Sequence, residues 1–126
     1  MKNLFQTLLI IAVGGWLAQT ARGAEDDPVK LAPRMYRVLL DNHQVRVLDV
    51  RLRPGQKTPM HSHPDYIIYA LEGGTARFFD EKGKATTMHV RPGKCVWRED
   101  ETHAVQNIGK HTIHVLNIEV KGVRMF

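Results

Sequence analysis

The sequence predicts an all-β fold, a single domain built as a barrel or sandwich of two antiparallel sheets. The 126 residues match the size of one domain. Short runs of strand-forming residues alternate with turn pairs such as Pro54-Gly55, Gly73-Gly74 and Pro92-Gly93. After residue 24, no window shows the period of a helix. Short strands at close, regular spacing are typical of a barrel or sandwich.

Residues 1–23 are predicted to be a signal peptide. Lys2 precedes an apolar stretch, residues 4–13, which only Gln6 and Thr7 interrupt. Small residues at Ala21 and Gly23 favour cleavage after Gly23, with cleavage one residue later as the second choice. The apolar stretch is shorter than the roughly 20 residues of a membrane span. We therefore expect export to the periplasm or the medium with no membrane span in the mature chain; the alternative is an uncleaved anchor.

Composition excludes several classes of protein. With 25% charged and 43% hydrophobic residues, the chain is neither disordered nor a polytopic membrane protein. Its single cysteine, Cys95, excludes an intrachain disulfide framework and a zinc site built from thiolates. Removal of the leader takes Lys2 and Arg22 with it, which lowers the net charge from +5 to +3. This small, dispersed charge does not favour a nucleic-acid partner.

Residues 24–34 are expected to be an irregular lead-in, because Pro28 and Pro33 interrupt them. The barrel domain is expected over residues 35–126. A four-residue loop with Gly83 near its end favours a hairpin at residues 81–84. The strands are predicted at residues 36–40, 45–53, 58–63, 66–71, 75–80, 85–90, 95–98, 103–108 and 112–120.

In two predicted strands, the alternation of apolar residues changes phase. The change falls between Val47 and Leu48 in one strand and between Val115 and Leu116 in the last. A β-bulge would cause it, and so would the covering of both faces at one end of the strand. A second subunit packed on one face is the third explanation, and the sequence leaves all three open.

The histidines of His61-Ser62-His63 are the strongest candidate site. In an extended segment residues i and i+2 share a face, so both imidazoles can converge on one point. His103 starts a later strand, on the same face as Val105 and Asn107. Three converging imidazoles can hold a transition metal with open positions for a ligand. The alternative is a chance pair of partly exposed loop histidines, since the chain has seven histidines.

Two motifs around these histidines resemble those of the cupin superfamily. Five residues separate Gly55 from His61-Ser62-His63, and Gly93 leads, through a short spacer, to His103 and Asn107. The resemblance covers nearly all of residues 35–121. It implies a double-stranded β-helix (jelly-roll) barrel of two antiparallel sheets, with His61, His63 and His103 as metal ligands. It also implies a small-molecule substrate or ligand and a homodimer.

The sequence departs from the cupin pattern where a glutamate ligand is usual. Counting forward from His63 places Ile67 there, and counting back from Gly73 places Tyr66. Ile67 cannot bind a metal, whereas the Tyr66 phenol could bind one or take part in catalysis, if its proton were displaced. The acidic residues 99–101 replace the Pro-x-Gly turn before His103, which predicts a loop of different shape.

The resemblance implies a metal-dependent enzyme acting on a small molecule. Imidazole ligands suit a divalent transition metal such as iron, zinc, manganese, nickel or copper. Oxygenase chemistry is the first expectation, with hydrolysis or isomerisation next. The alternatives are a non-catalytic module that binds a small ligand or the metal, and a structural barrel whose histidines are vestigial.

Other residues of interest receive structural expectations. Cys95 is expected to be a small buried residue, and Arg98 to lie on a solvated outer face. Asn107 could orient a ligand or satisfy backbone groups. The aromatic residues are expected to pack in the core or on a dimer face rather than to bind an aromatic ligand; these are Tyr66, Tyr69, Phe78, Phe79 and Trp97.

Overall fold

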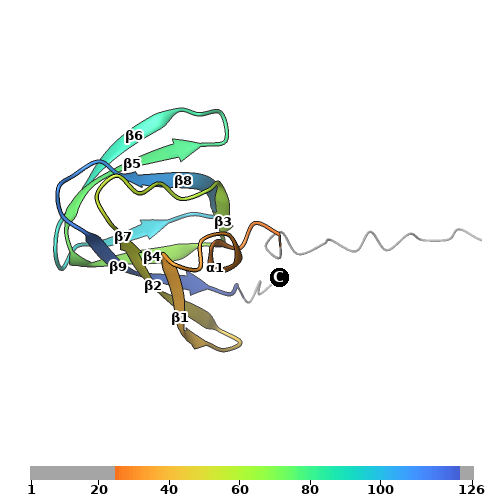
Figure 1. Ribbon diagram of the computed structural model, residues 1–126. Coiled ribbons are helices and arrows are strands. Elements are labelled where there is room, and N and C mark those ends of the chain that lie inside the picture. The colour runs from red at the N-terminus through yellow and green to blue at the C-terminus, as the bar shows by residue number, and fades with distance from the viewer. Residues whose placement is uncertain (1–24, 123–126) are drawn as a thin grey trace, which may run out of the picture.

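The computed structural model describes residues 25–122, in which two antiparallel sheets enclose a common interior (Figure 1). The predicted signal peptide lies outside these residues. The five-stranded sheet has the order β1-β2-β9-β4-β7, and the four-stranded sheet the order β3-β8-β5-β6. The elements are α1 (Pro28–Leu31), β1 (Tyr36–Asp41), β2 (Val45–Leu52), β3 (His61–His63), β4 (Tyr66–Glu72), β5 (Gly74–Asp80), β6 (Ala85–Val90), β7 (Cys95–Arg98), β8 (Glu101–Asn107) and β9 (Ile113–Val120). The all-β prediction is confirmed.

Turn chemistry places the predicted hairpin between β5 and β6. Gly83 has a φ of +80°, a conformation that side chains disfavour. The Asp80 carboxylate accepts hydrogen bonds from the backbone N–H groups of Lys82, at 2.9 Å, and Lys84, at 2.8 Å. These bonds fix the loop and therefore the register of the two strands that it joins.

The lead-in is not wholly irregular, as the sequence had predicted, because it contains the one-turn helix α1. Pro28 occupies the first helical turn, where its missing N–H costs nothing. The Asp27 side chain caps the helix by accepting from the N–H of Val29 at 3.0 Å. The backbone O of Asp26 accepts a hydrogen bond from the N–H of Ser62 at 2.9 Å, which ties the lead-in to β3. Within residues 25–122, no helix has the length and apolarity to cross a membrane.

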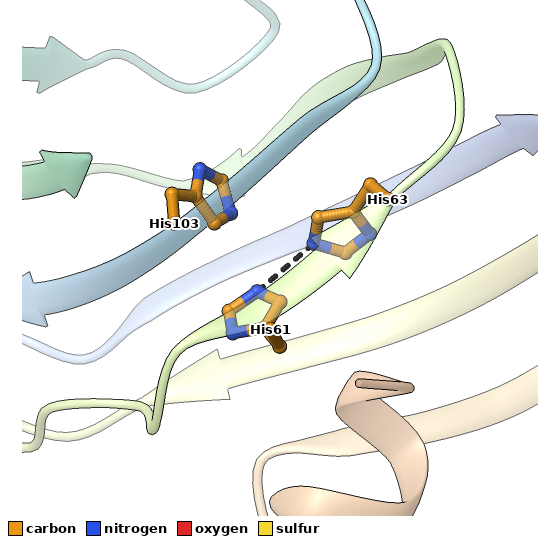
Figure 2. Close-up of side chains that lie close together, drawn as sticks. All are labelled: His61, His63 and His103. Carbon is orange, nitrogen blue, oxygen red and sulfur yellow. Dashed lines mark hydrogen bonds between the residues drawn. The ribbon is translucent and has the colours of Figure 1, made fainter. Parts of the chain in front are cut away.

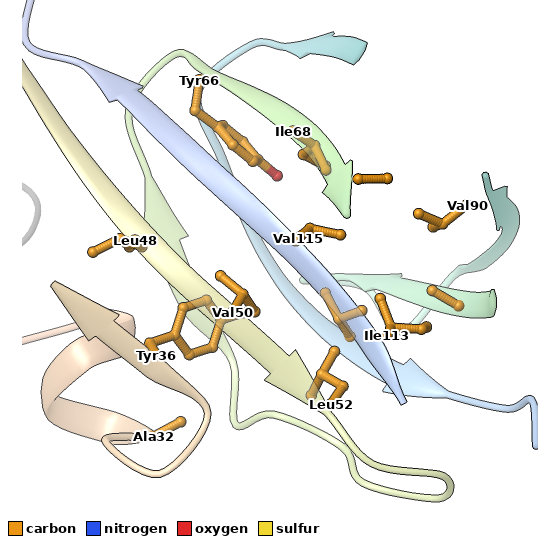
Figure 3. Packing of buried hydrophobic residues seen from close by; sticks show 13 residues of the cluster. Ala32, Tyr36, Leu48, Val50, Leu52, Tyr66, Ile68, Val90, Ile113 and Val115 are labelled. Carbon is orange, nitrogen blue, oxygen red and sulfur yellow. The ribbon is translucent and has the colours of Figure 1, made fainter. Parts of the chain in front are cut away.

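The hydrophobic core lies between the sheets (Figure 3). Leu48, Val50 and Leu52 alternate along β2 with their side chains inward, and each is at most 3% exposed. Ile113 and Val115 face the same interior from the neighbouring strand β9. Burial of these side chains supplies the main driving force for closing the barrel. It also holds β9, the strand between β2 and β4, in a fixed register.

The phase change in β2 and β9 does not come from a bulge in either strand. Their ladder is unbroken from Val45 opposite Val120 to Leu52 opposite Ile113. Part of the outer face of the sheet is apolar, because directly opposed apolar residues form a row across all five strands. We call this the outer apolar row, and it consists of Leu40, Val47, Ile118, Ile67 and Trp97.

The prediction that Cys95 is buried is wrong. Cys95 is exposed, and β7 is an edge strand of the five-stranded sheet. Cys95 lies opposite Tyr69, and Trp97, which is 54% exposed, lies opposite Ile67. Residues two apart on a strand share a face. Cys95 therefore lies on the same outer face as the outer apolar row.

Candidate metal centre

The three predicted histidines converge at one point inside the barrel (Figure 2). His61 and His63 project from β3, and His103 lies directly opposite His61 on the neighbouring strand β8. One nitrogen from each ring lies within 4.8 Å of the others. All three side chains are buried, with exposures of 0% to 3%. The pairing of β3 with β8 therefore assembles a group that could hold a metal ion.

Hydrogen bonds at Nδ1 fix which nitrogen of His61 and of His63 faces the centre. Nδ1 of His61 lies 2.8 Å from the carbonyl oxygen of Pro59, which can only accept a hydrogen bond. Nδ1 of His63 lies 2.8 Å from a carboxylate oxygen of Glu119. In a neutral ring whose proton is held on Nδ1, the lone pair of Nε2 points toward the centre.

The two Nε2 atoms lie only 3.0 Å apart, as the dashed line in Figure 2 marks. At this distance the two nitrogens either share a proton in a hydrogen bond or, when both carry lone pairs, bind one cation. The hydroxyl of Tyr36, 3.2 Å from Nε2 of His61, can donate to only one of them. The described residues therefore fit a transition ion, which accepts neutral imidazole nitrogen as a ligand.

The site electrostatics keep His61 and His103 neutral. Burial, followed by the nearby His63 and His103, lowers the pKa of His61 to about 3. Burial likewise lowers the pKa of His103, although Glu101 opposes this effect. Metal binding requires deprotonated nitrogen, so both rings are ready for an ion at neutral pH.

A chain of charged groups supports His63 from behind. Glu119 is 2% exposed, and its second oxygen accepts from Nε of Arg46 at 2.7 Å. The other guanidinium nitrogens of Arg46 lie 2.9 and 3.2 Å from the carboxylate of Asp27. Burial alone would raise the pKa of Glu119, but hydrogen bonds from His63 and Arg46 lower it, so the carboxylate stays ionised. A metal-binding histidine commonly has such a carboxylate behind it.

A second polar group lies beside His103. The Tyr66 hydroxyl donates to Glu101 at 2.6 Å, and Arg98 holds both oxygens of the same carboxylate, at 2.8 and 2.6 Å. Nδ1 of His103 lies 3.2 Å from a carboxylate oxygen of Glu101, within ion-pair distance, but makes no hydrogen bond with any described residue. Burial, together with the charge of Glu101, raises the pKa of Tyr66, so its phenol stays protonated.

The expectation that Arg98 lies on a solvated outer face is wrong. Its side chain is only 25% exposed and forms an ion pair with Glu101. Its guanidinium carbon lies 4.9 Å from the centroid of the Phe78 ring. Position 98 lies opposite Tyr66, which faces the interior. Successive residues of a strand face opposite sides of the sheet, so Arg98 faces inward and Trp97 faces outward.

Asn107 forms hydrogen bonds with backbone groups, which was one of the two roles predicted for it. Its amide N–H groups donate to the carbonyl oxygens of Leu52 and His111, each at 2.8 Å, and its amide oxygen accepts from the N–H of Gly109. The position therefore stabilises the turns at one end of the barrel and is not part of the histidine centre.

Sequence reasoning missed Glu101, Glu119 and Tyr36 as parts of the site. Glu119 could have been found from strand parity, because it shares a face with Ile113 and Val115 and would otherwise be a buried charge without a partner. Tyr36 shows no local signal, because its contact with His61 depends on how β1 and β3 are brought together.

Comparison with known proteins identifies the architecture. No protein-family model matches the sequence, and no curated protein matches it. A cupin domain from Bordetella pertussis superposes with a TM-score of 0.65 at 28% sequence identity, over 70% of this chain and 93% of that chain. The chain has the cupin fold.

Two further structures share the cupin fold at lower identity. One is a conserved protein with a double-stranded β-helix domain from Klebsiella pneumoniae, with a TM-score of 0.59 at 20% identity over 71% of this chain and 77% of that chain. The other is a predicted oxalate decarboxylase from Thermotoga maritima, with a TM-score of 0.51 at 24% identity over 68% and 77% of the two chains. At these identities, the similarity shows the fold alone.

Proposed function

We propose that this cupin is a metal-dependent enzyme that acts on a small molecule, with His61, His63 and His103 holding a divalent transition ion. The observation that carries the proposal is the convergence of one nitrogen from each of three buried imidazoles within 4.8 Å, with His61 and His63 each oriented by a contact at Nδ1. Oxygenase chemistry is the first candidate, on the resemblance to cupins. Three neutral histidine ligands leave the charge of the ion uncompensated, which favours an anionic substrate or bound hydroxide. Iron, zinc, manganese, nickel and copper all suit these ligands.

When bound, the ion would supply a Lewis-acid centre and, if redox-active, electron transfer. The chain itself does the positioning. Glu119 holds the proton on Nδ1 of His63, and Pro59 does the same for His61. Tyr66 stays a neutral phenol that donates to Glu101, so we assign it the role of a hydrogen-bonding group near the substrate rather than a metal ligand.

Access to the centre supports a small-molecule substrate. A cleft of about 220 Å³, which we call the outer cleft, reaches His103. It is lined by both apolar and charged groups, including Phe78, Met88, Arg98 and Glu101. Such a mixture is typical of sites that recognise small molecules.

A second function, a non-catalytic module that binds a small ligand or the metal, is favoured by one observation. The carboxylate nearest His103, that of Glu101, is already occupied by Arg98 and Tyr66. It is thus not free to act as an acid or base without breaking those bonds. Turnover separates the two functions, because a binding module would hold its ligand without consuming oxygen or substrate.

The first experiment is elemental analysis of the purified protein after reconstitution with each metal. Near-stoichiometric metal in the wild type, lost in His61→Ala/His103→Ala, would support the site. The matched control is His89→Ala/His111→Ala, which removes two exposed histidines and should keep the metal. Equal, negligible metal in all three proteins would overturn the proposal. If the wild type does hold metal, its identity selects the next assay. Iron or copper calls for measurement of oxygen consumption, and zinc for assays of hydrolysis or isomerisation.

Export and dimerisation are further parts of the proposal. We propose that the chain is exported to the periplasm or the medium, with residues 1–23 removed, and intact-mass measurement of the mature protein tests this. We also propose a homodimer that buries the outer apolar row. Trp97 is 54% exposed and Leu40 49% exposed, and apolar surface that is continuous across a sheet favours association.

A further inference from the structure

Tyr36 places a phenol hydroxyl beside the histidine centre. Tyr36 is 3% exposed, and its ring packs edge-on against His61 with 5.2 Å between the ring centroids. Among the described residues, the hydroxyl has one hydrogen-bond partner, Nε2 of His61 at 3.2 Å. Burial of a hydroxyl is unfavourable unless the group is paired, and a phenylalanine ring would pack in the same space without that cost. Packing therefore does not explain the hydroxyl at position 36.

An ion at the centre would remove the described partner of this hydroxyl. Nδ1 of His61 donates to the carbonyl oxygen of Pro59, so Nε2 of the neutral ring carries the lone pair. This lone pair can accept the hydrogen bond from Tyr36 or bind a metal ion, but it cannot do both. A buried O–H without an acceptor destabilises the protein, because it has lost its hydrogen bonds with water. Binding of the phenol oxygen to the same ion avoids this cost.

The spacing of the donor atoms fits a shared ion. Zinc–nitrogen and zinc–oxygen bonds are about 2.0–2.2 Å long, so neighbouring ligands of one ion lie roughly 2.8–3.6 Å apart. Nε2 of His61 lies 3.0 Å from Nε2 of His63 and 3.2 Å from the hydroxyl oxygen of Tyr36. Both distances fall within the range for two ligands of one ion.

The other oxygen donors near the centre already have partners. The carboxylates of Glu101 and Glu119 are each held by an arginine. Tyr66, at the position where the cupin pattern has a glutamate, donates to Glu101 at 2.6 Å. Tyr36 differs from all three, because its described partner is an atom that the ion itself would bind.

The backbone holds Tyr36 in place over β3. Tyr36 lies opposite Val50 of β2, and both side chains face the interior (Figure 3). The N–H of Tyr36 donates to the carbonyl oxygen of Ala32 at 3.1 Å. The lead-in is tied to β3 in turn, because the N–H of Ser62 donates to the carbonyl oxygen of Asp26. The phenol oxygen is therefore positioned before an ion binds.

We infer that Tyr36 supplies a fourth ligand, a phenolate oxygen, to the ion held by His61, His63 and His103. This inference rests on the proposed function and completes its ligand set with a residue that lies outside both cupin motifs. As the bond between oxygen and ion forms, the O–H bond breaks and the proton passes to the solvent. The phenolate compensates one of the two positive charges of the ion, and the other still favours an anionic substrate.

Release of this proton depends on the ion. Burial, followed by the charge of Glu119, raises the pKa of Tyr36 above its usual value, so the phenol keeps its proton when no metal is bound. A metal ion acts in the opposite direction, since zinc lowers the pKa of a bound water from about 15.7 to about 7. Proton release on metal binding therefore measures ligation by the phenol.

The test loads the purified protein with one equivalent of Cu²⁺, because a bond between Cu²⁺ and phenolate gives a charge-transfer band in the visible region. Tyr36→Phe removes the oxygen and keeps the ring. Tyr66→Phe is the matched control, because it removes the hydroxyl of a second buried tyrosine beside the centre. His61→Ala/His103→Ala reports any copper bound at the surface. Calorimetry in buffers of different ionisation enthalpy counts the protons released.

We expect the wild type and Tyr66→Phe to show the band and Tyr36→Phe to lack it. Tyr36→Phe should also release about one proton fewer per ion and bind Cu²⁺ at least tenfold more weakly in competition with a chelating dye. Resonance Raman spectra of the wild type, excited in the band, should contain phenolate ring modes that shift when the protein carries ring-deuterated tyrosine. This last measurement needs no substitution and therefore does not depend on the folding of a variant.

Copper bound at the three histidines without the band would overturn the inference alone, because the proposed metal site would still stand. A band that is kept in Tyr36→Phe and lost in Tyr66→Phe would also overturn it, because Tyr66 would then be the ligand. Equal, negligible copper in the wild type and in His61→Ala/His103→Ala would overturn the proposed function and the inference together.

Discussion

Nδ1 of His63 lies 2.8 Å from Oε1 of Glu119, and both side chains are buried. The second oxygen of this carboxylate is held by Arg46, so it cannot rotate away from the imidazole. The proton of the His63 ring is therefore confined to Nδ1, and Nε2 faces the centre of the barrel. One glutamate on the last strand thus determines which nitrogen of His63 is available to an ion.

Replacement of Glu119 by glutamine should lower metal affinity by roughly 10- to 100-fold. In Glu119→Gln the amide oxygen would pair with Arg46, leaving the amide N–H to face His63. Nδ1 would then have to accept, which moves the ring proton to Nε2 and blocks ligation. Competition with a chelating dye measures the affinity, and ¹⁵N NMR of the ring measures the tautomer. Glu72→Gln, at an exposed position of β4, is the control, and equal affinity in the two variants would contradict the role of Glu119.

The pairing of Asp27 with Arg46 should stabilise the lead-in against the barrel. The side chains of both residues are 16% exposed, so their ion pair is partly shielded from water. Asp27→Asn keeps a capping group for α1 but loses the charge beside Arg46, and should cost about 1 kcal/mol in the free energy of unfolding. Asp27→Ala loses the cap as well and should cost about 1 kcal/mol more. Urea unfolding measures both.

The neighbouring variant Asp26→Asn is the control for these two, because Asp26 is exposed and contributes its backbone oxygen rather than its carboxylate. If Asp27→Ala were no less stable than Asp27→Asn, the cap would have no energetic role. If all three variants matched the wild type, the lead-in would not be held by Asp27.

The strands could be predicted from sequence because their signals are local. Alternating apolar residues, together with turn pairs such as Pro92-Gly93, mark where each strand starts and stops. The convergence of His61 and His63 was also local, since it follows from the two-residue period of a strand. His103 required more, because its approach depends on β8 lying beside β3, and the resemblance to cupin motifs supplied that pairing.

The remaining features depend on contacts between distant segments or on edge position. Glu119 and His63 are 56 residues apart, and no local pattern joins them. The exposure of Cys95 follows from β7 being a sheet edge, which the sequence does not mark. The helix α1 was not predicted because it contains Pro28. Proline breaks the interior of a helix but is favoured in the first turn.

Asp49 should make stability depend on pH through a cluster outside the barrel interior. It contacts His114 at 2.9 Å, Arg37 at 3.2 Å and Arg51 at 3.3 Å. Burial alone would raise the pKa of Asp49, but the charges of His114 and Arg51 outweigh it and lower the pKa below the usual value. The unfolded chain therefore binds this proton first as pH falls. Its contribution is present at neutral pH and is lost as pH drops below about 4.

We expect Asp49→Asn to lower the free energy of unfolding by about 1 to 2 kcal/mol at pH 7. The difference from wild type should shrink as the pH is lowered from 5 to 2, because the wild-type carboxylate is then protonated as well. Urea unfolding at several pH values measures this, with Asp26→Asn as the exposed control. A difference that stayed constant over this range would assign the effect to packing rather than to charge.

A charge placed in the outer apolar row should dissociate the proposed dimer. Trp97 lies at the edge of the row and is 54% exposed, so Trp97→Glu removes apolar surface and introduces a charge without disturbing the core. If two copies bury this face, the glutamate would be desolvated in the dimer and solvated in the monomer, which raises the dissociation constant by at least tenfold. Sedimentation equilibrium of wild type and variant measures that constant.

Ile108→Glu is the matched control, because Ile108 is a 39% exposed apolar residue just after β8, in the other sheet. Loss of the dimer in both variants would locate the contact elsewhere, and a wild type that sediments as a monomer would mean that the outer apolar row does not hold two copies together.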